Sequence, residues 1–129
     1  MSAEITNKNF ELTDFVKNEI MTTLTFHETG GILGCEEIGV VNHFYYDVTG
    51  TSTDRNYIPD TTALNKVIAD WHMHGIKFVG FVHSHSAGKT ELSRLDVRYS
   101  EKIKRYCSMT EILMVIYIPE DKTFYKYVV

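Results

Sequence analysis

The feature that most constrains this chain is a short, mostly apolar run, residues 76–82 (IKFVGFV), followed directly by His83, Ser84 and His85. A run of this length and composition is typical of a β-strand buried on both faces, so other elements must cover the sheet on either side. Side chains two positions apart on a strand point to the same face. If the strand continues through His85, both imidazoles project together from its end.

The segments around this strand alternate between helical and strand patterns. Apolar spacing predicts helices over residues 15–24, 61–74 and 93–106, and β-rich runs predict strands over residues 32–35, 38–46, 76–82, 111–118 and 123–129. Phe15 and Tyr106 are among the residues expected on the buried helix faces. After a short polar lead, the order α-β-β-α-β-α-β-β predicts an α/β (α+β) fold, a mixed sheet flanked by helices in one domain over residues 1–129. The polar loop at residues 49–59 is long for a connection, and we expect it to contact a ligand.

Composition narrows the classes of function. The 129-residue chain has a net charge of -4, and this excess of acid argues against a nucleic-acid partner. Its two cysteines show no C-x-x-C spacing and do not indicate a disulfide framework. The N-terminus has no apolar signal core, and no window approaches the roughly eighteen apolar residues of a membrane span. We therefore expect a cytoplasmic protein without a membrane partner. Its oligomeric state, homodimer included, stays open.

Ser93 and Asp96 follow the two histidines and stand three apart on the first turn of a predicted helix, where they are near neighbours. The connecting residues 86–92 are long enough to fold this helix start back over the strand end. Two imidazoles and one carboxylate form the ligand set of a catalytic zinc site whose fourth position stays open. The sequence thus predicts that His83, His85 and Asp96 bind one Zn²⁺, with Ser93 beside the open position. The same set also accepts iron or manganese.

Glu28 is the candidate general base. It stands just before Gly30 and Gly31, a pair that lets the chain run close to other backbone before it enters a strand. Each of these signals has a simpler interpretation. An isolated glutamate usually faces solvent, and Ser93 with Asp96 matches a helix capping box. Capping and metal binding are compatible, because a capped helix start is a rigid platform for the carboxylate.

The remaining histidines do not extend the pattern. His72 and His74 repeat the H-x-H spacing, but they stand at a predicted helix end, where the two rings point in different directions. No serine and aspartate follow them at the offsets seen after His85. We expect these two to be surface residues, and His27 and His43 to be structural or surface residues.

Taken together, ETGGILG, VGFVHSHS and SRLD resemble the JAMM metalloproteases, also called MPN-plus or JAB domains, and the small prokaryotic members above all. The resemblance covers essentially the whole chain and implies their cytidine-deaminase-like fold with a curved mixed sheet. It implies that His83, His85 and Asp96 hold zinc. It also implies that Glu28 moves a proton from the attacking water to the leaving amine, while Ser93 hydrogen-bonds the oxyanion.

The resemblance implies a zinc-dependent metallopeptidase or isopeptidase acting after the C-terminal Gly-Gly tail of a ubiquitin-like or sulfur-carrier protein of the β-grasp type. Ser86 departs from the family pattern, where many members carry proline, but this removes no ligand. The stretch after Asp96 has no room for the insertion with which eukaryotic deubiquitinating members recognise a ubiquitin chain, so we do not expect a polyubiquitin-chain enzyme. Two alternatives are an amidase for a small or carrier-linked substrate and a non-catalytic interaction module.

Overall fold

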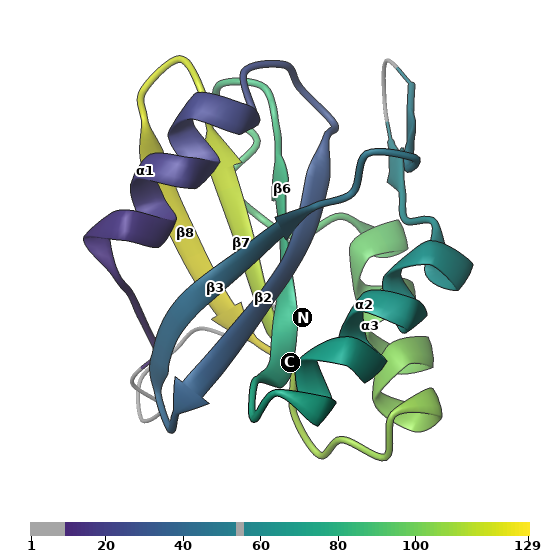
Figure 1. Ribbon diagram of the computed structural model, residues 1–129. Coiled ribbons are helices and arrows are strands. Elements are labelled where there is room, and N and C mark those ends of the chain that lie inside the picture. Colours follow the sequence, from purple (N-terminus) through teal and green to yellow (C-terminus); the bar gives the residue numbers. More distant parts are fainter. Residues whose placement is uncertain (1–9, 54–55) are drawn as a thin grey trace.

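The apolar run at residues 76–82 lies in a central strand of a mixed sheet (Figure 1). The computed structural model describes residues 10–53 and 56–129, and within these ranges the sheet has six strands in the order β1-β3-β2-β6-β7-β8. Their bounds are β1 Glu11–Leu12, β2 Gly30–Glu37, β3 Val40–Tyr46, β6 Lys77–Ser84, β7 Leu113–Ile118 and β8 Thr123–Val128. Because β6 runs antiparallel to β2 and parallel to β7, the predicted mixed sheet is confirmed.

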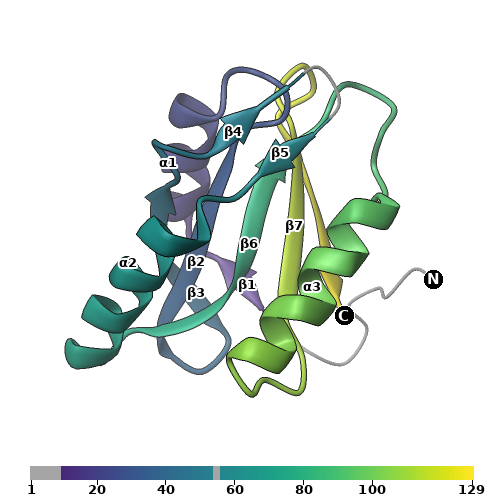
Figure 2. The same cartoon turned by 90° about the vertical axis from the view of Figure 1, so that its right-hand side faces the viewer.

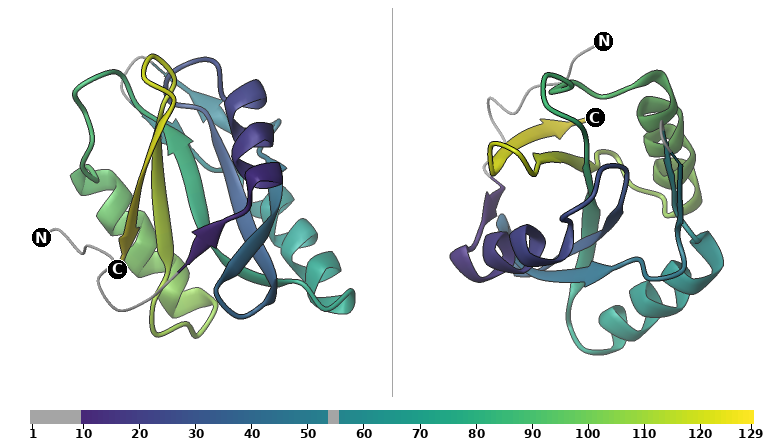
Figure 3. Two further views of the ribbon diagram at one scale, coloured as in Figure 1. Left: turned by 90° about the vertical axis from the view of Figure 1, so that its left-hand side faces the viewer. Right: turned by 90° about the horizontal axis from the view of Figure 1, so that it is seen from above.

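Helices cover both faces of the sheet, as the doubly buried strand requires. Helix α1 (Asp14–Thr23) packs on one face, and α2 (Thr61–Met73) and α3 (Arg94–Tyr106) lie on the other (Figures 2 and 3). β6 contributes to both cores: Val79 and Val82 join the cluster around α1, whereas Phe78 and Phe81 join the cluster under α2 and α3. This three-layer arrangement confirms the α/β (α+β) prediction.

Each predicted helix begins at its expected cap. Thr13 Oγ1 accepts the Val16 N–H, Asp60 Oδ1 accepts the Ala63 N–H, and Ser93 caps α3. Two members of the predicted inner faces are wrong, because Phe15 is 66% exposed and Tyr106 is 73% exposed. On α1 the buried face follows Val16 and Ile20, about 100–140° away from Phe15 around the helix axis, and Tyr106 is the last residue of α3.

Three short strands depart from the prediction. β1 lies within the expected polar lead, and the expected loop at residues 49–59 holds a two-stranded sheet of β4 (Thr51–Ser52) and β5 (Tyr57–Ile58). Each has only two residues, too few to show an alternation of apolar and polar positions. Residues 1–9 of the lead and 54–55 of the loop lie outside the described part of the chain.

Gly80 marks the tightest approach of β6 to β7. A Cβ atom at this position would lie 1.8 Å from the Leu113 carbonyl oxygen. We expect Gly80→Ala to lower the free energy of unfolding by about 2–3 kcal/mol, as overpacking of a fixed backbone does. Gly75→Ala is the control, because Gly75 has φ +75 but no neighbour within 4 Å, which leaves only a conformational cost of about 1 kcal/mol. Urea unfolding measures the free energy of unfolding of both variants. If both lose the same amount of stability, a clash between a Cβ at position 80 and the Leu113 carbonyl oxygen is not the cause.

Candidate metal centre

His83 and His85 meet at the end of β6, as their spacing predicts. His83 is registered against Gly30 of β2 and Ile116 of β7, and the His85 N–H continues the pairing to the Tyr117 carbonyl. Both rings are buried, and their Nε2 atoms lie 2.8 Å apart. His85 Nδ1 lies 2.9 Å from the Lys89 carbonyl oxygen, which can only accept, so this nitrogen carries the hydrogen. In the neutral ring, the Nε2 lone pair of His85 is then directed at His83.

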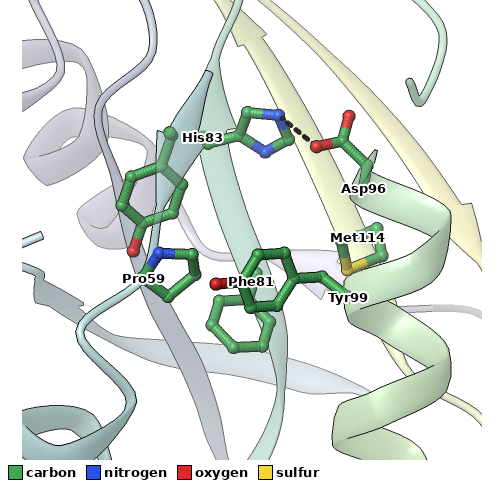
Figure 4. Close-up of a pocket in the computed structure, with 7 residues that line it drawn as sticks. Pro59, Phe81, His83, Asp96, Tyr99 and Met114 are labelled. Atoms are coloured by element: carbon green, nitrogen blue, oxygen red, sulfur yellow. Dashed lines mark ion pairs between the residues drawn. The ribbon is translucent and has the colours of Figure 1, made fainter. Parts of the chain in front are cut away.

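Asp96 reaches the same point from the first turn of α3 (Figure 4). Its Oδ1 lies 3.2 Å from His83 Nε2 and its Oδ2 lies 3.5 Å from His85 Nε2. The capping box with Ser93 is also present, since the Ser93 N–H donates to Asp96 Oδ2 and the Asp96 N–H to Ser93 Oγ. Tetrahedral zinc with bonds of about 2.0–2.1 Å needs its ligand atoms about 3.3 Å apart. The separations of 2.8, 3.2 and 3.5 Å are close to this value, with the two Asp96 distances ending on different oxygens of the carboxylate, and Asp96 acts as a cap at the same time.

Glu28 approaches from a segment far away in the sequence. It sits in the turn before β2 and is 6% exposed, so the solvent-facing alternative is wrong. Its Oε2 lies 3.9 Å from His85 Nε2, and Glu28, His83 and His85 each offer one ligand atom within 4.8 Å of the others. A Cβ on Gly30 would lie 2.6 Å from the Val82 carbonyl oxygen, which confirms the close backbone approach expected of the Gly-Gly pair.

Burial and the two imidazoles shift the pKa values of the Glu28 and Asp96 carboxyl groups in opposite directions. Burial raises the pKa of Glu28, and the nearby His85 and His83 only partly offset it. Burial also raises the pKa of Asp96, but hydrogen bonds with His83 and His85 outweigh this and leave that pKa well below its usual range. Asp96 is thus suited to stay ionised, while Glu28 is suited to take up and release a proton. Two carboxyl groups separated in this way are typical of acid–base sites.

Comparison with known proteins agrees with this geometry. A family model described as prokaryotic homologs of the JAB domain matches residues 23–126, a range that includes all five predicted site residues. The chain belongs to the prokaryotic JAB family. A JAB domain with a buried Glu, His, His group able to bind a metal ion fits a metal-dependent hydrolase. None of the curated proteins matches the chain.

A solved structure has a similar fold. The solution structure of protein DSY2949 from Desulfitobacterium hafniense matches with a TM-score of 0.67 at 18% sequence identity, covering 91% of this chain and 80% of that one. At this identity the likeness concerns the fold alone. It therefore supports the sheet and helix arrangement that brings the site together and says nothing of its chemistry.

The four histidines that we expected to be surface or structural residues lie outside the candidate metal centre. His72 and His74 are exposed at the end of α2, and His27 and His43 pair with Glu120 and Glu36. Both cysteines, Cys35 and Cys107, are free thiols. Among the residues that the structure describes, no helix combines the length and apolar character needed to cross a bilayer.

Two residues near the candidate metal centre belong to no motif by which the sequence could have identified them. Tyr57 of β5 stacks on the His83 ring with centroids 6.0 Å apart, and its hydroxyl donates to the buried Asp47 Oδ2 at 2.6 Å. Asp47 Oδ2 also accepts the Asp60 N–H, so one carboxylate ties β5 to the start of α2. Tyr57 lines a small pocket of about 20 Å³. His83 and Asp96 also line this pocket (Figure 4). Its remaining walls are Pro59, Phe81, Tyr99 and Met114.

Tyr57→Phe removes this hydroxyl and leaves the buried Asp47 carboxylate short of a donor. We expect the free energy of unfolding to fall by about 1–2 kcal/mol, the cost of a buried group that loses its partner. Tyr106→Phe is the matched control, because Tyr106 is 73% exposed, and its unfolding should not change. Denaturant titration of the two variants measures the difference. If both variants are equally stable, the hydrogen bond from Tyr57 to Asp47 does not anchor the β4–β5 hairpin.

Proposed function

We propose that the chain is a zinc-dependent metallopeptidase or isopeptidase that hydrolyses the amide bond after a C-terminal Gly-Gly tail of a ubiquitin-like or sulfur-carrier protein. The observation that carries the proposal is the meeting of three donors, the buried His83 Nε2 and His85 Nε2 and the half-buried Asp96 carboxylate, at separations of 2.8 to 3.5 Å. Glu28 Oε2 lies 3.9 Å from His85 Nε2, farther away than the Asp96 oxygens lie from the histidines, which favours Glu28 as the proton-transfer group beside them.

His83, His85 and Asp96 would hold the zinc ion. Zinc, when bound there, lowers the pKa of a water and polarises a carbonyl group. Glu28 then accepts a proton from the attacking water and delivers it to the leaving amine, a task for which its raised pKa is favourable. The hydrogen bond from His85 Nδ1 to the Lys89 carbonyl fixes the ring with Nε2 facing the other donors.

Ser93 supplies a donor for the oxyanion of the tetrahedral intermediate. Its Oγ accepts the Asp96 N–H, so the hydroxyl hydrogen is left to donate to a ligand. The capping box fixes the serine on the same rigid turn that carries Asp96. A preorganised donor of this kind contributes about 3–4 kcal/mol to stabilising the transition state.

A Gly-Gly tail is supported by the shape of the approach to the donors. The pocket next to His83 and Asp96 holds about 20 Å³, room for roughly one water, which favours a substrate residue without a side chain beside the cleaved bond. Glycine needs no such room. The short β4–β5 hairpin lies next to this pocket through Tyr57, and an extended tail can pair with such a strand by its backbone.

The test uses a β-grasp protein that ends in Gly-Gly and is joined through an amide bond to a reporter. We expect the protein loaded with one equivalent of zinc to cleave after the second glycine, and a chelator to stop the reaction until zinc is restored. A matched fusion ending in Val-Val should stay intact. Cleavage of short amides but not of the fusion would support the amidase instead, and tight binding without cleavage would support the interaction module.

A further inference from the structure

Ser84 stands between the two histidines of the candidate centre but faces the opposite side of β6. Successive side chains on a strand alternate in direction, so Ser84 shares the α1 side with Val82, whereas His83 shares the other side with Phe81. Its side chain is fully buried. Ser84 thus cannot join the donor cluster, and its contacts lie instead with the turn at residues 26–29, which carries Glu28.

The hydroxyl of Ser84 binds this turn at both of its ends. Ser84 Oγ donates a short hydrogen bond to the Phe26 carbonyl and accepts the Thr29 N–H at 3.1 Å. Main-chain bonds continue the contact, because the Glu28 N–H donates to the Ser84 carbonyl and the Ser84 N–H donates to the Thr29 carbonyl, both at 2.8 Å. A hydroxyl is a donor and an acceptor at once, which a turn offering one carbonyl and one N–H requires. Alanine offers neither.

The turn needs such an anchor because Glu28 has a left-handed backbone with φ +58. A residue other than glycine rarely adopts this conformation and keeps it only where its surroundings impose it. The other side-chain contacts of this turn are more exposed to solvent. His27 pairs with Glu120 through side chains that are 42% and 45% exposed, and Ser52 Oγ reaches the His27 carbonyl at 3.5 Å. Ser84, whose own side chain is fully buried, supplies contacts that are part-buried.

We infer that Ser84 is a positioning residue whose hydroxyl holds the turn at residues 26–29 in the conformation that directs Glu28 toward His83 and His85. This role of Ser84 has a structural part and a catalytic part. The structural part concerns only the backbone of the turn. The catalytic part, that loss of the hydroxyl impairs proton transfer by Glu28, rests on the proposed function. Separate measurements test the two parts, so that failure of one is distinguishable from failure of the other.

Amide hydrogen exchange measured by NMR tests the structural part. In Ser84→Ala we expect the Thr29 and Glu28 amides to exchange about tenfold faster, since both hydrogen bonds of the Ser84 hydroxyl to the turn are lost and the turn opens more often. Ser84→Thr keeps the hydroxyl and should restore slow exchange. Ser100→Ala is the matched control, because Ser100 is equally buried and bonds to the Val97 carbonyl within α3. Unchanged exchange at both amides in Ser84→Ala would overturn the inference.

Kinetics on the Gly-Gly fusion test the catalytic part. We expect Ser84→Ala to lower kcat by about 10- to 100-fold, the range for loss of a group that orients a catalytic residue, with KM and zinc affinity nearly unchanged. In a Glu28→Gln background the same substitution should have no further effect, because Ser84 acts through Glu28. An equal loss of kcat in both backgrounds would contradict the role of Ser84 in positioning Glu28.

If Ser84→Ala does not fold, Ser84→Cys, which is a weaker hydrogen-bonding partner, should give an intermediate loss of kcat. If the unmodified protein cleaves no fusion, the proposed function fails while the exchange result stands on its own.

Discussion

Replacement of Glu28 by glutamine is expected to lower kcat of the zinc-loaded protein on a Gly-Gly fusion by about 10²–10⁴, the share of general acid–base catalysis. The amide keeps the size and polarity of the side chain but can no longer take up the proton of the attacking water. The site around it should persist, because Glu28 is held through its backbone N–H by the Ser84 carbonyl. Initial rates measure the loss, and metal analysis of the purified variant measures bound zinc.

The zinc content of this variant decides how the result is read. Glu28 Oε2 lies 3.9 Å from His85 Nε2, farther than either oxygen of Asp96 lies from its histidine partner, so the variant should bind zinc within a few-fold of the unmodified protein. Glu36→Gln is the control, since Glu36 also pairs with a histidine, His43, but lies away from the centre. A variant that keeps full activity would rule out Glu28 as the base.

The parts of this centre that could be predicted from the sequence are those set by local geometry. His83 and His85 share a face because they stand two apart on a strand, and Ser93 and Asp96 lie together because they stand three apart on a helix start. The helix caps and the hairpin partners follow from equally local patterns. In each case the distance between the residues in the sequence is short, so the backbone alone fixes their relation.

Contacts between segments that are far apart in the sequence are not marked by any comparable spacing pattern. Glu28 was predicted as the base from the Gly-Gly pair that follows it and from the resemblance, but neither its burial nor its positive φ follows from spacing, because its turn packs against Ser84 of a strand that comes much later in the chain. Asp47 and Tyr57 were missed for the same reason. Phe15 and Tyr106 show the converse error: an apolar side chain next to a buried stripe was assigned to it, although tertiary packing left it exposed.

Replacement of Asp96 by asparagine is expected to weaken zinc binding by at least about 100-fold, more than the loss of a group that only supports a ligand. Asp96 has a lowered pKa and is ionised, so it supplies a negative charge to an ion otherwise faced by two neutral rings. The amide is neutral and a poorer ligand, but its oxygen can still accept the Ser93 N–H that the carboxylate accepts now. Helix α3 should therefore stay capped, and circular dichroism should show unchanged helix content.

Competition with a chromophoric chelator measures the affinity. Asp70→Asn is the control, because the exposed Asp70 pairs with His74 in the same way but far from the centre, and it should bind zinc normally. Two carboxylates lie beside the same histidines, so Asp96→Asn and Glu28→Gln together distinguish two ligand sets. Lost zinc in the first and retained zinc in the second would assign the ion to His83, His85 and Asp96. The reverse pattern would make Glu28 the third ligand, in the Glu, His, His group that also lies within 4.8 Å, and would leave the reaction without its proposed base.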